Sequence, residues 1–395
     1  MGVSRRRLFG SLCGLVFLVN ASRVVFAPLL SEFIAHFGMT TATAGTVVTL
    51  VWVGSAVPRV PTGWLLTRHS RLAVVLSTGA VLTAASAFTA AAGSVPALAA
   101  GALSMGLASG AYFVSANPLL SELFPGSVGR VMGVHGTASQ FAAVAAAPAV
   151  TLAVTVGGGR LPVAGWRLVF VAVGLFAAGV TALVLVSGRR TDLPDAGGAD
   201  RDLTGAVRRE WRTVLLGVVV LGTTGFVWQG VFNFYELYMV RKGLADATAK
   251  NLITVVFAAG IPAFLVSGRL ADRFSHVPYM LAVLAAFVAG LVALTVVGGL
   301  VGVVAVSLYV GVVIHSLFPA MDAYLLDTLP DESRGSAYAV YSGSMMLAQS
   351  TGSSVVGTLR EAGLRYATVF RSFAAVLVVV VAGLVVLRRL GRLPE

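Results

Sequence analysis

The chain has 395 residues, of which 57% are apolar and only 11% charged, and its mean hydropathy is +0.90. This composition excludes an ordinary soluble globular protein, which needs a larger polar exterior. The net charge of +12 would suit a nucleic-acid-binding protein. The basic residues, however, lie in short clusters between apolar runs, without the interleaved aromatic residues of a single-strand-binding surface, so we expect no nucleic-acid partner.

An arginine cluster, Arg5-Arg6-Arg7, precedes the first apolar run. The pattern is similar to a twin-arginine export signal, which would be followed by a soluble domain. Further apolar runs follow here instead. We therefore interpret these arginines as a cytoplasmic anchor for the first helix.

Twelve apolar stretches follow one another along the chain, and each is long enough to form a membrane-spanning helix. They fall into two groups of six. The first group lies at about residues 8–36, 40–66, 72–93, 96–122, 129–156 and 164–187, and the second at about 212–239, 247–268, 277–298, 300–326, 335–358 and 367–388. The predicted fold class is an all-α integral membrane protein with twelve transmembrane helices.

The longest polar stretch runs from Ser187 to Arg212 and divides the chain almost in half. Its mixture of charged residues and glycines predicts a linker, with one interfacial helix from about Leu203 onward. The predicted domains are an N-terminal six-helix bundle over residues 1–187, a cytoplasmic linker over residues 188–211 and a C-terminal six-helix bundle over residues 212–395.

The basic residues are distributed unequally between the two sides of the membrane. With the amino terminus in the cytoplasm, most of them fall on cytoplasmic segments, and a minority, including Arg241, Arg360 and Arg365, fall outside. This excess satisfies the positive-inside rule. We therefore expect a multi-pass protein of the cell membrane, surrounded by the lipid bilayer, with both termini in the cytoplasm.

The two halves are related by a repeat with an offset of 205 residues. Loop residues obey the offset as well as apolar ones, so chance similarity of two hydrophobic halves does not explain it. The pairs include Gly63 and Gly268, Arg68 and Arg273, Glu122 and Asp327, and Pro125 and Pro330. Because each half has an even number of helices, the copies run parallel, related by an axis along the membrane normal, with a cavity where they meet.

Two loops carry a resemblance to a known family. The chain reads Gly63-Trp-Leu-Leu-Thr-Arg68-His-Ser-Arg71 after the second helix and Gly268-Arg-Leu-Ala-Asp272-Arg273 after the eighth. Both resemble the G-x-x-x-D-R signature loop of the major facilitator superfamily, although Thr67 replaces the acid in the first half. The resemblance implies that Gly63, Arg68, Arg71, Gly268, Asp272 and Arg273 form a latch on the cytoplasmic side.

Arg23 is the clearest ionisable residue inside the membrane. It stands fifteen residues beyond Leu8, roughly 22 Å along the first helix and near mid-membrane. Asn20 lies three residues earlier and shares its face. In the resembled family the first, fourth, seventh and tenth helices line the central cavity, which implies that Arg23 faces the substrate path. A guanidinium favours a carboxylate or phosphate; the alternative is a structural salt bridge with an embedded acid.

The other candidate residues are polar side chains in apolar runs. Trp228 is the repeat partner of Arg23, and Trp228 could equally face lipid or pack in the core. In the tenth helix, His315 and Asp322 are two turns apart and could couple proton movement to transport, although His315 could instead be a packing residue or bind substrate. Glu236 and Glu32 lie nearer the outer ends, where gating or solvation is the alternative to proton coupling. The remaining candidates for substrate binding are Gln229, Asn233, Tyr112, Gln140, Tyr341 and Gln349.

The resemblance implies a secondary transporter that moves a small solute by alternating access. We predict a small organic anion as the substrate, with proton coupling in symport. One alternative is efflux of amphipathic or drug-like compounds, and another is a non-transporting receptor or scaffold on the same fold. The dispersed histidines and the missing phosphate-binding loop predict no enzyme activity, no metal site and no cofactor. We expect the protein to be a monomer.

Overall fold

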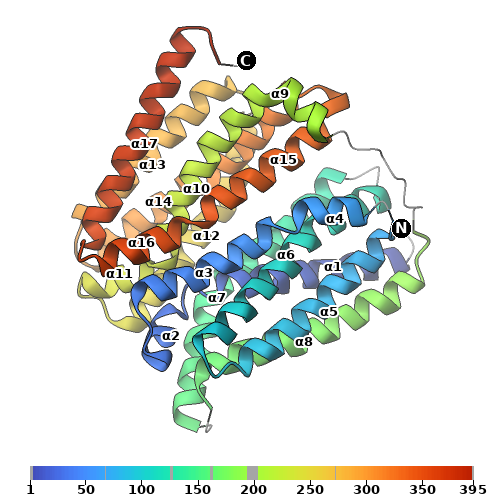
Figure 1. The fold of residues 1–395 in the computed structure, drawn as a ribbon, viewed down its shortest axis with the longest axis horizontal. Helices are drawn as coiled ribbons and strands as arrows, with labels where there is room; N and C mark the ends of the chain where they lie inside the picture. Colours follow the sequence, from blue (N-terminus) through green and yellow to red (C-terminus); the bar gives the residue numbers. More distant parts are fainter. Residues whose placement is uncertain are drawn as a thin grey trace. The chain divides into compact units, whose positions relative to one another are not determined.

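The computed structural model describes residues 3–66, 68–124, 128–160, 163–193, 203–271 and 273–393. Within these ranges, all regular secondary structure is helical (Figure 1). The apolar stretches form helices because a backbone in lipid has to satisfy its hydrogen bonds within its own segment.

The first half of the chain forms eight helices in its described residues. Two of the predicted spans are divided, so that α1 and α2 form the first and α3 and α4 the second. The helices are α1 (Val3–Val24), α2 (Leu30–Phe37), α3 (Thr41–Ala56), α4 (Arg59–Leu65), α5 (Arg71–Ala90), α6 (Val95–Leu123), α7 (Val128–Arg160) and α8 (Gly165–Arg189).

The second half forms the remaining helices. The predicted seventh span is built from α9, a π-helical segment, α10 and α11, and the eleventh from α15 and α16. The elements are α9 (Leu203–Gly217), η1 (Val218–Gly222), α10 (Thr223–Asn233), α11 (Tyr235–Arg241), α12 (Asp246–Ala271), α13 (His276–Val296), α14 (Leu300–Thr328), α15 (Asp331–Ser350), α16 (Gly352–Glu361) and α17 (Tyr366–Arg389).

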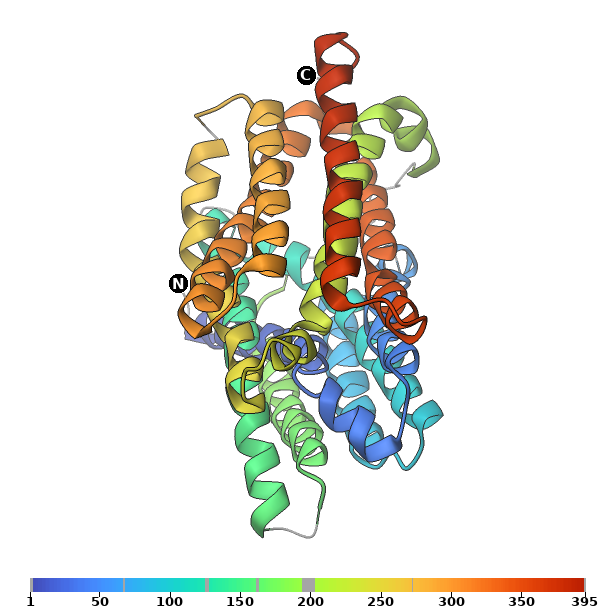
Figure 2. The ribbon, with the colours of Figure 1, turned by 90° about the vertical axis from the view of Figure 1, so that its left-hand side faces the viewer.

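The chain groups into two compact units. The first comprises residues 1–39 and 46–200, and the second comprises residues 40–45 and 201–395. Figures 1 and 2 show the long helices of each unit side by side in a bundle. The linker bounds stay a prediction: α8 continues to Arg189, α9 already begins at Leu203, and residues 194–202 lie outside the described ranges.

The helix boundaries follow the offset of 205 residues. α6 runs from Val95 to Leu123, and its shifted positions are the two ends of α14, Leu300 and Thr328. Gly38 and Gly243, which share the offset, both have positive φ, of 61° and 91°. Glycine accepts this left-handed conformation without steric cost, so each half turns in the same way after its first span.

Ten helical segments of the described residues are long and apolar enough to cross a membrane. They match ten of the predicted spans. The other two predicted spans, residues 247–268 and 335–358, correspond to α12 and to α15 with α16.

Glycines let one pair of helices approach closely in each unit. A Cβ on Gly106 of α6 would overlap the carbonyl oxygen of Val51 in α3, and a Cβ on Gly311 of α14 would overlap the carbonyl oxygen of Val256 in α12. These two contacts are related by the same offset. Close approach through small residues is how helices pack in lipid, where the hydrophobic effect gives little attraction between them.

Candidate functional site

Arg23 lies near the end of α1 and is almost fully buried in the first unit, with 7% of its surface exposed. Its Nη2 donates a hydrogen bond of 2.6 Å to Oδ1 of Asn20, one helical turn earlier, as expected from their spacing. Its Nη1 donates a weaker bond of 3.3 Å to Oγ of Ser55 in α3. The Asn20 amide in turn donates to the backbone oxygen of Ser139 in α7 at 2.7 Å. Three helices therefore hold the guanidinium in place.

Aromatic rings flank the guanidinium. The Cζ atom of Arg23 lies 5.0 Å from the ring centroid of Trp52 in α3 and 5.2 Å from that of Phe113 in α6. Both distances are in the range of cation–π attraction, which partly replaces the hydration that a buried cation loses. The rings therefore stabilise the charge without neutralising it.

Within the described residues, Arg23 bonds to neutral side chains and to no carboxylate. Its Nε–H is buried and has no hydrogen-bond partner there. The structural salt bridge considered as an alternative is thus not found in the described part of the first unit. A guanidinium has five N–H donors, and two bonds leave donors available for a ligand.

Arg59 is a second cation beside this site, and the sequence reasoning did not single it out. Its Nε donates to the backbone oxygen of Ser55 at 3.3 Å, and it lies close enough to Arg23 to interact with it electrostatically. The sequence signal was available, because Arg59 stands within the apolar run at residues 40–66. We call Arg23, Asn20, Ser55 and Arg59 the guanidinium site.

Tyr112 and Gln140 lie elsewhere in the first unit. Tyr112 is fully buried in α6, and its hydroxyl donates to the backbone oxygen of Leu12 at 2.8 Å. The Nε2 atom of His135, another residue not singled out, is 3.0 Å from the same hydroxyl. Because the hydroxyl proton is directed to Leu12, Nε2 of His135 donates here. Gln140 is half-buried in α7, directly after Ser139.

A polar cluster connects α10 with α16 in the second unit. The Asn233 amide donates to Oε1 of Gln229 at 3.1 Å and to Oγ of Ser353 at 2.9 Å. All three side chains are buried. The Oδ1 atom of Asn233 has no hydrogen-bond partner in the described part of this unit. The predicted residues Gln229 and Asn233 therefore lie together and retain an acceptor.

Trp228 belongs to an aromatic cluster rather than to a lipid-facing surface. It is 7% exposed, and its ring centroid lies 5.8 Å from that of Phe232 and 6.5 Å from that of His315. Phe257 in α12 completes the cluster, 5.4 Å from His315. Nδ1 of His315 is 2.8 Å from the carbonyl oxygen of Gly311, which can only accept, so this nitrogen carries the proton.

Tyr341 and Gln349 lie on different parts of α15. Tyr341 is buried in a hydrophobic cluster with Leu325 and Leu329, beside Gly217. Gln349 is buried against Gly225 of α10. Tyr341 is thus a core residue of the second unit, whereas Gln349 lies near the polar residues of α10.

The acidic candidates have distinct surroundings. Glu236 is 2% exposed, and its Oε1 lies 3.7 Å from Nζ of Lys250 in α12, which forms a buried ion pair. Glu32 is half-buried in the first turn of α2, where the helix dipole favours an acid. The side chain of Asp322 lies outside the described residues, as does that of Asp327. Proton coupling by any of these groups stays a prediction.

The first-half latch residues are only partly brought together. Arg71 Nη1 forms an ion pair of 2.6 Å with Oε2 of Glu122, joining the start of α5 to the end of α6. Glu122 is thus the ion-pair partner of Arg71. Arg68 is exposed and stacks on Trp64, its Cζ 4.2 Å from the ring centroid, while Gly63 is half-buried in α4.

In the second half, Arg273 is exposed after α12. Asp272 and the side-chain position of Gly268 lie outside the described residues. The latch role of all six residues therefore stays a prediction.

The structure also contains a basic pocket that the sequence reasoning missed. Arg241, Arg360 and Arg365 line it together with Tyr238 and Tyr366, and its volume is about 360 Å³. Its signal in the sequence was the group of arginines on the side predicted to face outward. Next to it, partial burial lowers the pKa of Lys242, whose ammonium donates to the backbone oxygen of Val297.

Solved structures of transporters share this fold at low sequence identity. A D-xylose–proton symporter superposes with a TM-score of 0.79 at 15% identity, over 97% of each chain. A bacterial homolog of the human lysosomal transporter Spinster, in its inward-facing and occupied conformation, gives 0.76 at 16%, over 98% of this chain and 96% of that one. The inward-open xylose transporter XylE from E. coli gives 0.76 at 14%, over 96% and 94%.

The family is shown by the sequence itself. The chain matches the profile of the Major Facilitator Superfamily over residues 12–353 and a second time over residues 242–394. No curated protein matches it. The predicted family and the predicted twelve-helix fold class are confirmed. The chain therefore belongs to the major facilitator superfamily and is a multi-pass membrane transporter.

Proposed function

We propose that the protein is a secondary transporter of a small organic anion and that the guanidinium site binds the anionic group. The observation that carries this proposal is the burial of Arg23 among neutral partners, with an N–H donor unused in the described residues. A charged arginine at the centre of a membrane helix costs about 2.5 to 3.5 kcal/mol on insertion scales. Because Arg23 forms no salt bridge in the described residues, its guanidinium can bind the anionic group of a substrate.

The chemistry of the site favours a carboxylate or a phosphate ester. A guanidinium can bind either group through two parallel hydrogen bonds, and it is charged at neutral pH. Arg59 adds a second positive charge beside Ser55. The rings of Trp52 and Phe113 give the surroundings a low polarity, which strengthens an ionic hydrogen bond.

Transport in proteoliposomes tests this proposal. Uptake of radiolabelled monocarboxylates, dicarboxylates and phosphate esters is measured with the wild-type protein, with Arg23→Gln, with Arg23→Lys, and with Arg189→Gln as a control at an exposed arginine of α8. For the transported anion, Arg23→Gln should raise KM by about 10- to 100-fold, the value of a lost charged hydrogen bond. Arg23→Lys should be intermediate, and Arg189→Gln should match the wild type.

Undiminished anion flux through Arg23→Gln would refute the guanidinium site as the anion-binding site. Flux of amphipathic cations but of none of the anions would favour the alternative of drug-like efflux. That alternative has less support, because the large rings of the second unit pack on one another. No flux of any solute would favour the receptor or scaffold.

We further propose that transport is coupled to protons through α14, where His315 and Asp322 are two turns apart. The aromatic contacts of His315 and the 2.8 Å contact of its Nδ1 with the carbonyl oxygen of Gly311 fix the orientation of the imidazole, a group that can take up and release a proton. The proton symporter among the similar structures supports coupling only as an analogy of fold.

Coupling can be separated from binding. His315→Gln and Asp322→Asn are compared with the wild type in uptake driven by an imposed pH gradient and in exchange of internal for external anion without a gradient. The variant that removes the coupling group should lose accumulation and keep exchange. If both variants accumulate anion like the wild type, neither residue couples protons to transport.

A further inference from the structure

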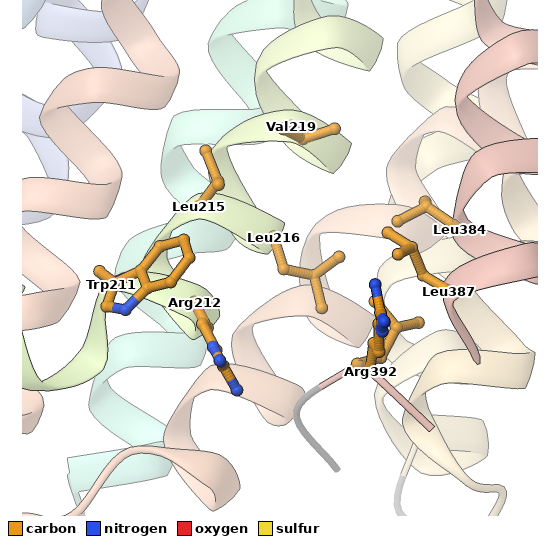
Figure 3. Close-up of a pocket in the computed structure, with 9 residues that line it drawn as sticks. Trp211, Arg212, Leu215, Leu216, Val219, Leu384, Leu387 and Arg392 are labelled. Atoms are coloured by element: carbon orange, nitrogen blue, oxygen red, sulfur yellow. The ribbon is translucent and has the colours of Figure 1, made fainter. Parts of the chain in front are cut away.

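A pocket lies between the start of the seventh span and the end of α17, within the second unit (Figure 3). Its volume is about 440 Å³. Leu215 and Leu216 of α9 line one wall, and Leu384 and Leu387 of α17 line the other. The pocket therefore offers an apolar groove between two membrane helices.

Two arginines lie at one end of this groove. Arg212 comes from α9, and Arg392 follows α17; Figure 3 shows both at the end away from Val219. Both are exposed, and Arg212 lies 5.6 Å from the ring centroid of Trp211. No aspartate or glutamate is among the residues that line this pocket in the described part of the chain. The groove is thus apolar along its length and cationic at its end.

Arg212 lies in the first turns of one candidate membrane span, and Arg392 lies just beyond the end of another. These spans are Val207–Asn233 and Tyr366–Arg389. The backbone of α9 leaves helical geometry at Glu210, with φ −104° and ψ 18°, directly before the pocket. Trp211 and Leu215 are half-exposed on the outside of the unit, at 51% and 50%. A tryptophan and arginines beside exposed leucines are typical of the boundary between headgroups and acyl chains.

We propose that this pocket binds an anionic phospholipid, with its phosphodiester on Arg212 and Arg392 and an acyl chain along the leucines. A free phosphate would satisfy the two guanidinium groups and leave the apolar walls empty. A neutral lipid would cover the leucines and leave the cations without a counterion. Only an anionic amphiphile uses both, and basic pockets at helix ends attract anionic headgroups of the cytoplasmic leaflet. This site is separate from the guanidinium site.

Trp211 provides a probe of occupancy in the full-length protein. Phosphatidylglycerol or phosphatidylcholine with brominated acyl chains is added to the detergent-solubilised protein, and the quenching that disappears in Trp211→Phe is assigned to the pocket. We expect phosphatidylglycerol to quench Trp211 at a concentration at least about tenfold lower than phosphatidylcholine, that is about 1.4 kcal/mol. Arg212→Gln with Arg392→Gln should abolish this preference.

Arg189→Gln with Arg190→Gln is the matched control, because it removes the same charge from an exposed helix end in the other unit. This control should keep the preference for phosphatidylglycerol. Equal quenching by both lipids, or equal loss in the control variant, would overturn the proposal. Inorganic phosphate added as a competitor should leave quenching unchanged, and displacement of the lipid by millimolar phosphate would show that the pocket is a simple anion site.

Discussion

At the residue scale, the guanidinium site and the aromatic cluster occupy equivalent places in the two units. Arg23 is related to Trp228 by the offset of 205 residues, and Trp52 is related to Phe257. Arg23 lies against the ring of Trp52 in the first unit, and Trp228 lies against the ring of Phe257 in the second. One copy of the repeat therefore presents a cation where the other presents an indole.

A second difference between the repeats explains how the imidazole of His315 is accommodated beside Gly260. It is the repeat partner of Gly110, while Ser55 is the partner of Gly260. In the first unit Gly110 makes room for the backbone of Ser55, and in the second unit Gly260 makes room for the imidazole ring. At this contact, the glycine is on the fourth span in the first unit and on the second span in the second unit.

This difference predicts a strong coupling between two substitutions. A Cβ on Gly260 would lie 2.5 Å from Cγ of His315, so Gly260→Ser should lower the free energy of unfolding by about 1–3 kcal/mol through overpacking. In a His315→Ala background the same substitution should cost little, because the imidazole atoms that the new Cβ would overlap are gone. A double-mutant cycle on Tm and on denaturant unfolding in detergent measures the coupling.

Gly383→Ser is the control for this cycle, since a Cβ at Gly383 of α17 meets nothing within 4 Å. It reports the intrinsic effect of serine at a helical glycine. Equal costs of Gly260→Ser in the two backgrounds would show that the imidazole does not depend on the space left by Gly260.

At the scale of the helices, two close contacts related by the repeat are the crossings of α3 with α6 and of α12 with α14. The glycines Gly106 and Gly311 hold these crossings because no side chain separates the backbones there. In lipid, dispersion contacts between closely packed helices replace the hydrophobic effect as a source of stability. These two crossings also position the residues of both sites, since Trp52 and Phe257 lie one residue beyond the contacted carbonyls.

Replacing glycine by alanine should have opposite effects on stability inside and outside these crossings. Gly106→Ala and Gly311→Ala should each destabilise the protein by about 1–3 kcal/mol, because the new methyl group overlaps backbone atoms that cannot move independently. Gly179→Ala in α8 and Gly383→Ala in α17 meet open space and should stabilise it by up to about 1 kcal/mol through helix propensity. Thermal unfolding in detergent compares the four variants, and similar Tm values for all of them would contradict the packing argument.

At the scale of the whole molecule, the distribution of charge predicts the orientation in the membrane. Both termini are expected in the cytoplasm because the basic residues concentrate on that side. The turn at Gly93, between α5 and α6, and the turn at Gly298, between α13 and α14, are then outside. The exposed positions His69 and Ser275 are inside.

Single cysteines test this orientation. In a Cys13→Ser background, which removes the only native thiol, Gly93→Cys and Gly298→Cys should react with an impermeant maleimide on intact cells. His69→Cys and Ser275→Cys should react only after the membrane is permeabilised. The reverse pattern would show the opposite orientation, and labelling of one half only would contradict the parallel repeat.

The sequence alone was enough to determine the spans, the repeat and the family. Hydropathy identifies the spans because lipid excludes unpaired backbone groups. Turn glycines such as Gly38 and Gly243 mark helix ends in the sequence itself. The burial of Arg23 could also be predicted, because a cation is rare in an apolar run and therefore conspicuous.

Only the tertiary structure decided which polar groups meet. It brought Arg59 beside Ser55 and Arg23, joined His135 to Tyr112 and paired Glu236 with Lys250. It also placed Tyr341 in the core and assembled the pocket of Arg212 and Arg392 from segments far apart in the chain. The physical reason is that these contacts depend on the rotation of each helix and on which helices cross closely, and almost uniformly apolar helices carry little periodic signal for either.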